Sequence, residues 1–163
     1  LSKIESGFIT ANISSIRFSE ISSFVETTFK PISEAKNFKF RIEVDPKLPE
    51  NIDTDSQRLN QILKNLLSNS FKFTEKGEIK FRIFRADKNW KTGNLALDKA
   101  ANVVGFSIID SGIGIPQDKQ TIIFEAFQQA EGSTSRKYGG TGLGLSISRG
   151  LAETPMNRWW WWL

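Results

Sequence analysis

The chain has 163 residues, 39% of them hydrophobic, and thirteen Phe, which fits one domain with a substantial apolar core. It contains no Cys and no His, which excludes disulfides, zinc-thiolate sites, cysteine nucleophiles and serine-histidine triads within it. The net charge of +4 permits an anionic partner, but Lys and Arg are scattered, so we expect no binding to nucleic acid. No apolar stretch approaches the roughly 20 residues that span a bilayer, so we expect no membrane contact by this fragment.

The first predicted elements are a strand, a helix and a second strand. Residues 12–18 are typical of a short strand, and Ser19 is expected to cap the helix after it. Side chains at helical spacing predict that helix: Ile21, Phe24, Val25, Thr28 and Phe29. Apolar and charged side chains alternate over residues 38–44, which predicts a strand with one buried face.

A turn-rich connection and a long helix follow. Asp, Asn and Pro residues over 45–51 predict turns. Asp55 or Ser56 can cap the next helix, which is expected to reach about Phe73. Its predicted apolar face consists of Leu59, Ile62, Leu63, Leu66, Leu67, Ser70 and Phe73.

The second half of the chain returns to strands before a final helix. Residues 78–85 alternate as a strand, and the nearly continuous apolar run over 103–109 is expected to be a central strand. The polar stretch 87–102 between them predicts a long loop. Loops with short helical pieces over 112–138 then precede a helix over 143–153. This order lacks strict βαβ alternation, so it predicts an α+β fold with two layers rather than a doubly wound sheet.

One side of the long predicted helix carries a polar line, made of Arg58, Gln61, Asn65, Asn69 and Lys72. A solvated helix edge would explain such a line, but Asn is a poor helix former and solvent positions usually carry Lys, Glu, Gln or Arg. The Asn carbonyl oxygen is a compact neutral ligand for Mg²⁺, and a Lys one turn further along can meet the phosphates that the cation binds. The line therefore indicates a site for metal-bound phosphate, with a solvated edge as the alternative.

A second candidate motif begins with Asp110, directly after the apolar run. A carboxylate at the end of a strand can accept a hydrogen bond from an exocyclic amino group. Gly112 and Gly114 allow a flat ring to approach the backbone, and Ile113 or Ile115 can supply an apolar wall. An Asx-type turn without a ligand is the alternative explanation.

The segment over 124–146 combines an aromatic pair with a glycine-rich run. Phe124 and Phe127 lie one helical turn apart, a spacing that also suits ordinary packing. The run over 138–146 can turn consecutive backbone N–H groups toward a phosphate at a helix start, or it can be a flexible surface loop. It lacks the Lys of a Walker A loop and the third glycine of a dinucleotide fingerprint.

Taken in order, the segments 65–74, 110–116, 124–127 and 140–145 resemble the N, G1, F and G2 boxes of sensor histidine kinases. These kinases share a superfamily with gyrase B, mismatch-repair ATPases and heat-shock chaperones. The sequence of residues 133–138 is similar to that of the lid of hybrid kinases. The resemblance implies a Bergerat-type ATP-binding fold, a two-layer α/β sandwich whose mixed, mostly antiparallel sheet carries helices on one face. It also implies ATP and Mg²⁺ as cofactors.

By that resemblance, Asn69 would coordinate Mg²⁺, Lys72 would reach the phosphates and Phe73 would pack beside the adenosine. Asp110 would accept the adenine amino group, which selects ATP over GTP because guanine presents a carbonyl there. The nearby glycines would let the base lie close, two Phe would anchor a mobile lid, and the glycine-rich run would close over the phosphates. The implied nucleotide-binding residues are Asn65, Asn69, Lys72, Phe73, Asp110, Gly112, Gly114, Ile115, Phe124, Phe127, Arg136, Lys137, Tyr138, Gly140, Thr141, Gly142, Leu143, Gly144 and Leu145.

Asn65 distinguishes the subclasses of this superfamily. Gyrase-type relatives carry Glu there as the base that activates water, whereas Asn cannot take a proton at neutral pH, so we expect slow hydrolysis. In histidine kinases the nucleophile is a His on a neighbouring domain, and this chain has none. The resemblance therefore implies a catalytic domain that transfers the γ-phosphoryl group of ATP to a His on a separate dimerisation domain. A non-catalytic nucleotide-binding module and a superfamily ATPase are the alternatives.

The resemblance also implies a domain organisation and partners. Residues 1–8 resemble the end of a dimerisation helix, residues 9–153 the ATP-binding catalytic domain, and residues 154–163 an atypical Trp-rich tail that we interpret as an artefact. The implied partners are the dimerisation and phosphoacceptor domain of the same protein and the receiver domain of a response regulator. The parent protein is expected to be a homodimer, with this domain in the cytoplasm.

Overall fold

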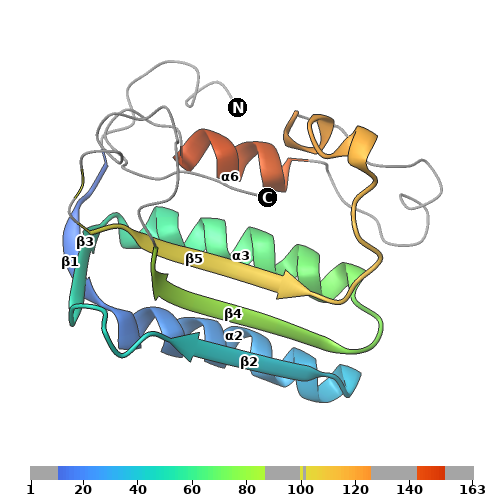
Figure 1. Ribbon diagram of the computed structural model, residues 1–163, viewed down its shortest axis with the longest axis horizontal. Helices are drawn as coiled ribbons and strands as arrows, with labels where there is room; N and C mark the ends of the chain where they lie inside the picture. Colours follow the sequence, from blue (N-terminus) through green and yellow to red (C-terminus); the bar gives the residue numbers. More distant parts are fainter. Residues whose placement is uncertain (1–10, 87–99, 101, 126–142, 153–163) are drawn as a thin grey trace.

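A computed structural model describes residues 11–86, 100, 102–125 and 143–152. Within these residues, helices α2 (Phe18–Lys36) and α3 (Ser56–Phe73) pack on one face of a small mixed sheet (Figure 1). The two-layer α+β class predicted from the order of elements is therefore confirmed.

The larger sheet has the strand order β2-β4-β5, with β2 (Lys39–Val44), β4 (Glu78–Arg85) and β5 (Val104–Asp110). β2 pairs with β4 in parallel, and β4 pairs with β5 antiparallel. The prediction that the apolar run over 103–109 forms the central strand is wrong for the described part of the chain, where β4 is central. The reason is strand pairing: β4 has a partner along each edge, β2 and β5, whereas among the described residues β5 pairs with β4 alone.

A second, two-stranded sheet joins β1 (Ser14–Arg17) to β3 (Asn51–Thr54) in antiparallel register. The sequence predicted β1 but only turns over 45–51, so β3 was missed. Ser14 lies opposite Thr54 and Arg17 opposite Asn51. β3 forms by pairing with β1, a segment far away in the chain. Its short, polar sequence therefore gives little local indication of a strand.

Helix α2 begins earlier than predicted. Its N-cap is Arg17, which makes no side-chain capping hydrogen bond, so the prediction that Ser19 caps the helix is wrong. The N–H group of Phe18 donates to the carbonyl of Glu50 at 3.3 Å instead, and this tertiary contact replaces a side-chain cap. Ile21, Val25 and Phe29 are buried as their helical spacing predicts, and Asn37 ends the helix in the left-handed conformation, with φ of 53°.

Helix α3 is capped by Asp55, one of the two predicted caps. Its Oδ1 accepts a hydrogen bond from the Arg58 N–H at 3.1 Å, and its Oδ2 lies 3.3 Å from Arg58 Nε in a buried ion pair. Arg58 therefore belongs to the start of the helix, buried beside its cap, rather than to an exposed polar line along α3. The helix ends at Phe73, as predicted.

The core between the helices and the sheet is centred on an aromatic cluster at the end of α3. The ring centroid of Phe71 lies 5.1 Å from that of Phe29, 5.3 Å from that of Phe38 and 5.2 Å from that of Phe40. The predicted apolar face contained Phe73, but Phe71 is the buried residue and Phe73 is only half-buried. Phe71 stands four residues after Leu67, on the row that also holds Leu59 and Leu63.

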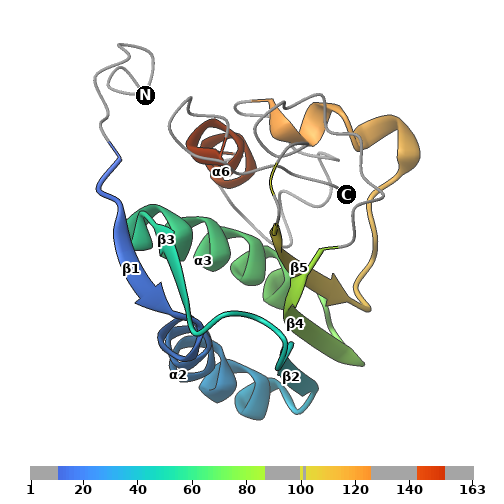
Figure 2. The ribbon, with the colours of Figure 1, turned by 60° about the vertical axis from the view of Figure 1, so that its left-hand side comes forward.

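Helix α6 (Gly144–Ala152) lies on the other side of α3 from α2 (Figure 2). Asn65 contacts the start of α6, and Ile62 packs with its last residues, so the two helices run antiparallel. The short 3-10 helices η1 (Gln117–Lys119) and η2 (Ile122–Phe124) confirm the predicted helical pieces in the loop before it. In the described part of the chain, no helix has the length and apolar character that crossing a membrane requires.

Candidate nucleotide-binding site

The carboxylate of Asp110 stands at the end of β5, and two hydrogen bonds fix its orientation. Oδ2 accepts from the hydroxyl of Ser70 on α3 at 2.9 Å, and Oδ1 accepts from the backbone N–H of Gly112 at 2.9 Å. Asp110 itself is exposed, so its remaining lone pairs are open to a ligand. The arrangement is an acceptor of fixed direction beside the C-terminal half of α3.

The loop after Asp110 is held against the end of α3 and the start of β4. The N–H of Ile113 donates to the carbonyl of Phe73 at 3.3 Å, and the N–H of Ser111 donates to the carbonyl of Glu78 at 3.2 Å. The hydroxyl of Ser111 accepts from the Glu78 N–H at 3.0 Å and lies 3.0 Å from the carbonyl of Lys76. These contacts connect the loop to two elements at once and keep Asp110 in place.

Close packing explains why residue 112 is a glycine, whether or not a ligand binds. A Cβ atom at this position would lie 2.6 Å from the carbonyl oxygen of Phe73 and 2.9 Å from Oδ1 of Asp110. Gly114 differs, because its φ of 69° is left-handed but a Cβ there would meet no atom within 4 Å. The neighbouring Ile113 and Ile115 are 64% and 40% exposed, as apolar walls of an open site would be.

Replacing Gly112 with alanine is expected to lower the free energy of unfolding by about 1 to 3 kcal/mol, because backbone atoms must shift to admit the methyl group. Urea denaturation measures this loss as a lower midpoint at unchanged slope. Gly144→Ala is the matched control, since its Cβ would lie 3.9 Å from the nearest atom, Cγ of Asn65. Equal midpoints for Gly112→Ala and the wild type would contradict the close approach of this loop to α3.

Helix α3 presents Asn65 to α6. The Nδ2 atom of Asn65 donates to the carbonyl of Gly144 and to the hydroxyl of Ser148, each at 3.2 Å. Ser148 is fully buried. Asn65 therefore fixes the first turn of the helix that follows the predicted lid.

Asn69 lies one turn further along α3. Its side chain is half-buried, and the described residues provide it with no hydrogen-bond partner. No cluster of three or more acidic side chains that could hold a metal is present in the described residues. An amide oxygen with an available lone pair fits a Mg²⁺ ion whose other ligands come from phosphate and water.

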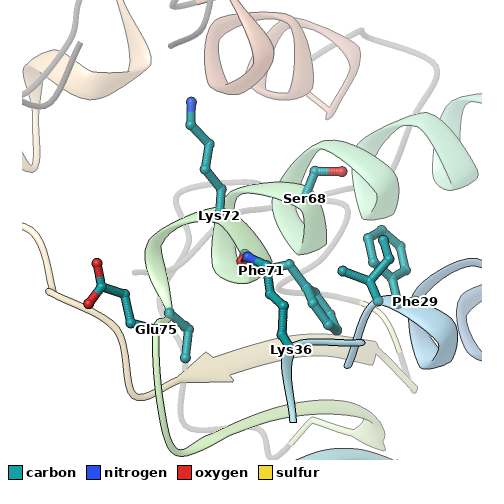
Figure 3. Close-up of a pocket in the computed structure, with 8 residues that line it drawn as sticks. Phe29, Lys36, Ser68, Phe71, Lys72 and Glu75 are labelled. Carbon is teal, nitrogen blue, oxygen red and sulfur yellow. Dashed lines mark hydrogen bonds between the residues drawn. The ribbon is translucent and has the colours of Figure 1, made fainter. Parts of the chain in front are cut away.

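Lys72 ends the polar line of α3, and Phe73 follows it as the last residue of the helix. The Lys72 Nζ atom lies 4.9 Å from the centroid of the Phe73 ring. Figure 3 shows the Lys72 amino group pointing away from the aromatic pair Phe29 and Phe71, which lie on the opposite side of α3. The lysine thus extends toward the side of α3 on which α6 lies.

Figure 3 also shows a hollow that is distinct from the predicted site. This groove of about 600 Å³ runs between α2 and α3, and Lys72 is the one predicted site residue in its lining. Its lining residues are Phe29, Ile32, Lys36, Ser68, Phe71, Lys72, Thr74 and Glu75. The motifs from the sequence therefore converge on the other side of α3, toward α6 and the end of β5.

Phe124 ends η2 beside α6, where the guanidinium of Arg149 lies 5.9 Å from the centroid of its ring. Leu143 accepts the first hydrogen bond of α6, from the N–H of Ile147 at 2.9 Å. Leu145 is half-buried in the first turn. The remaining predicted lid residues lie outside the described part of the chain: Phe127, Arg136, Lys137, Tyr138, Gly140, Thr141 and Gly142.

Three serines with central positions in the site were not predicted: Ser70, Ser111 and Ser148. Ser70 was assigned only to the apolar face of α3. A serine on an apolar helix face was itself a signal, because a buried hydroxyl requires a hydrogen-bond partner. The sequence alone does not identify that partner.

A family model described as histidine kinase-, DNA gyrase B-, and HSP90-like ATPase matches residues 54–162. The hybrid signal transduction histidine kinase L of Dictyostelium discoideum is 38% identical over 157 residues, which are 96% of this chain and 9% of that protein. The autoinducer 2 sensor kinase/phosphatase LuxQ of Vibrio vulnificus is 36% identical over 152 residues, 93% of this chain and 17% of that protein. The chain therefore spans 9% to 17% of the length of these two curated relatives.

Solved structures with the same fold include full-length ShkA in complex with AMPPNP. It has a TM-score of 0.74 and 28% identity, and the match covers 94% of this chain and 28% of that one. The nucleotide-free catalytic domain of histidine kinase ThkA has a TM-score of 0.61 and 27% identity, covering 87% of this chain and 80% of that domain. These similarities confirm the Bergerat-type fold expected from the sequence motifs.

Proposed function

Since this chain belongs to the histidine kinase-, DNA gyrase B- and HSP90-like ATPase family, we propose that it is the Mg-ATP-binding catalytic domain of a sensor histidine kinase. The domain transfers the γ-phosphoryl group to a His on a separate dimerisation domain. The observation that carries the proposal is the carboxylate of Asp110, held in one direction by Ser70 and Gly112 at the open end of β5. Such an acceptor matches the exocyclic amino group of adenine.

Adenine recognition is assigned to the loop after β5. The fixed Asp110 carboxylate accepts a hydrogen bond from the amino group of adenine and would meet a carbonyl, another acceptor, in guanine. The exposed side chains of Ile113 and Ile115 provide apolar surface for the base, and Phe73 lies at the adjoining end of α3. Together these groups favour ATP over GTP.

Phosphate binding is assigned to α3 and to the start of α6. Asn69 would hold Mg²⁺ through its amide oxygen, and bound Mg²⁺ neutralises charge that develops on the phosphates. Lys72 extends toward the same side of α3 and supplies a second positive charge. The N–H groups at the start of α6, whose position Asn65 fixes, face outward from a helix terminus that favours anions.

Phosphoryl transfer requires a nucleophile from outside this sequence, because the sequence contains no His. Asn65 cannot act as a base at neutral pH, and both of its Nδ2 hydrogen bonds go to α6. This favours transfer to a protein acceptor over activation of water. The acceptor belongs to a dimerisation domain of a homodimeric parent protein that carries this catalytic domain in the cytoplasm. The hybrid kinases among the relatives favour a response-regulator receiver as the next carrier.

The proposal is tested by mixing the full chain with a separately produced dimerisation domain and ATP labelled at the γ-phosphate. We expect acid-labile, base-stable label on the dimerisation domain and none on a variant whose acceptor His is replaced by Ala. Nucleotide binding without transfer would favour the non-catalytic module instead. Rapid release of inorganic phosphate with an unlabelled partner would favour a water-activating ATPase.

Replacing Asp110 with asparagine is expected to weaken ATP binding by about 1 to 3 kcal/mol, because the amino group of adenine loses its charged acceptor. Isothermal titration calorimetry measures the change as a dissociation constant. Asp118→Asn is the matched control, since Asp118 is an exposed carboxylate of η1, with no contact to Ser70 or Gly112. Unchanged ATP affinity in Asp110→Asn would remove Asp110 from adenine recognition.

A further inference from the structure

Ser70 occupies an unusual position for a polar residue. It is 7% exposed, and it follows Asn69 directly on α3. Serine hydroxyls inside helices commonly bond back to the carbonyl four residues earlier. The Ser70 hydroxyl instead donates across the fold to Oδ2 of Asp110, forty positions later in the chain.

The hydrogen bond from Ser70 determines how far the Asp110 carboxylate can turn. The N–H of Gly112 holds Oδ1 locally, from two residues further along the same loop. The hydroxyl of Ser70 holds Oδ2 from α3, which is anchored in the core by Leu63, Leu67 and Phe71. Ser70 is therefore the described side-chain hydrogen bond that ties the carboxylate directly to α3.

We propose that Ser70 is a positioning residue for base selection, which acts by orienting the Asp110 carboxylate toward the amino group of the nucleotide base. The inference rests on the proposed function, because it requires Asp110 to contact that amino group. Ser70 itself touches no part of the nucleotide. Its effect is confined to ligands that carry an exocyclic amino group, since a base without one makes no use of the orientation of the carboxylate.

The test compares two nucleotides in the full chain by calorimetry: ATP and purine riboside triphosphate, which lacks the amino group. Ser70→Ala is expected to weaken ATP binding about three- to tenfold, through the lost preorganisation of one side chain. Binding of purine riboside triphosphate is expected to stay unchanged, which also shows that the variant is folded. Ser70→Thr keeps the hydroxyl and is expected to restore much of the ATP affinity.

Two controls sharpen the comparison. Ser68→Ala makes the same change on an exposed position of α3 and is expected to leave both affinities unchanged. The double variant with Ser70→Ala and Asp110→Asn is expected to bind ATP no more weakly than Asp110→Asn alone, because Ser70 acts through that carboxylate. A further loss in the double variant would overturn the positioning role.

Equal weakening of both nucleotides by Ser70→Ala would show a general structural role and overturn the inference, as would unchanged affinity for both. A wild-type chain that binds ATP and the analogue equally would refute the contact between Asp110 and the amino group, and the role of Ser70 with it. A wild-type chain that binds neither nucleotide would refute the proposed function itself. If the wild type binds ATP more tightly than the analogue, the proposed function stands. A Ser70→Ala result against the expectation then refutes only the positioning role of Ser70.

Discussion

Replacing Asn69 with alanine is expected to slow phosphoryl transfer to the partner domain by roughly 100- to 1,000-fold, because the proposed Mg²⁺ site would lose its amide ligand and leave transition-state charge on the phosphates uncompensated. The half-buried Asn69 amide has no hydrogen-bond partner among the described residues, so the substitution breaks no described hydrogen bond within the domain. Initial rates of labelling of the dimerisation domain, over a range of Mg²⁺ concentrations, measure the effect.

The free energy of unfolding separates this loss from a loss of structure. Asn60→Ala is the matched control, since it makes the same change on the same helix outside the predicted site. Both variants are expected to unfold at urea concentrations close to that of the wild type or slightly higher, because Ala is the better helix former. Full transfer by Asn69→Ala at limiting Mg²⁺ would show that the metal is held elsewhere.

Replacing Phe71 with alanine is expected to lower the free energy of unfolding by about 3 to 5 kcal/mol, a large part of the total stability of a domain. The side chain is 3% exposed, and its ring packs against three others, those of Phe29, Phe38 and Phe40. The substitution leaves a cavity where α2, α3 and β2 meet. Urea denaturation measures the loss, with an unchanged slope if the unfolded state is unaltered.

Phe73→Ala provides the contrast two residues further along α3. Its side chain is half-buried and belongs to the predicted site, so we expect a stability loss of only about 1 kcal/mol together with weaker ATP binding. Phe71→Leu, which keeps most of the apolar volume, is expected to recover part of the stability lost in Phe71→Ala. Comparable losses for Phe71→Ala and Phe73→Ala would contradict the assignment of Phe71 to the core.

Most elements of the fold were predictable because their signals are local. The alternation over 78–85 defines β4, the cap at Asp55 defines the start of α3, and apolar spacing identifies α2. The errors concern elements that depend on distant partners. β3 is too short and polar to be recognised without β1, and α2 starts without a side-chain cap because Glu50 satisfies its first N–H.

In the candidate site too, single residues were predictable from local sequence, whereas the contacts between distant residues were not. Asn69, Lys72, Asp110 and the glycines were identified from residue type and spacing, and most of the lid lies outside the described residues. The contacts that organise the site were not identified, because they join residues far apart in the chain. Ser70 meets Asp110 across forty positions, and Asn65 meets Gly144 across seventy-nine.

The sequence by itself therefore determined the class of fold, the order of most elements and the chemistry available to the site, since each follows from periodicity or from the groups that side chains carry. Only the tertiary structure decided that β4 rather than β5 is central, that Phe71 rather than Phe73 is in the core, and that Ser70 holds Asp110. The physical reason is that burial and long-range hydrogen bonds depend on which faces of distant segments meet. Local patterns limit those faces but do not select their partners.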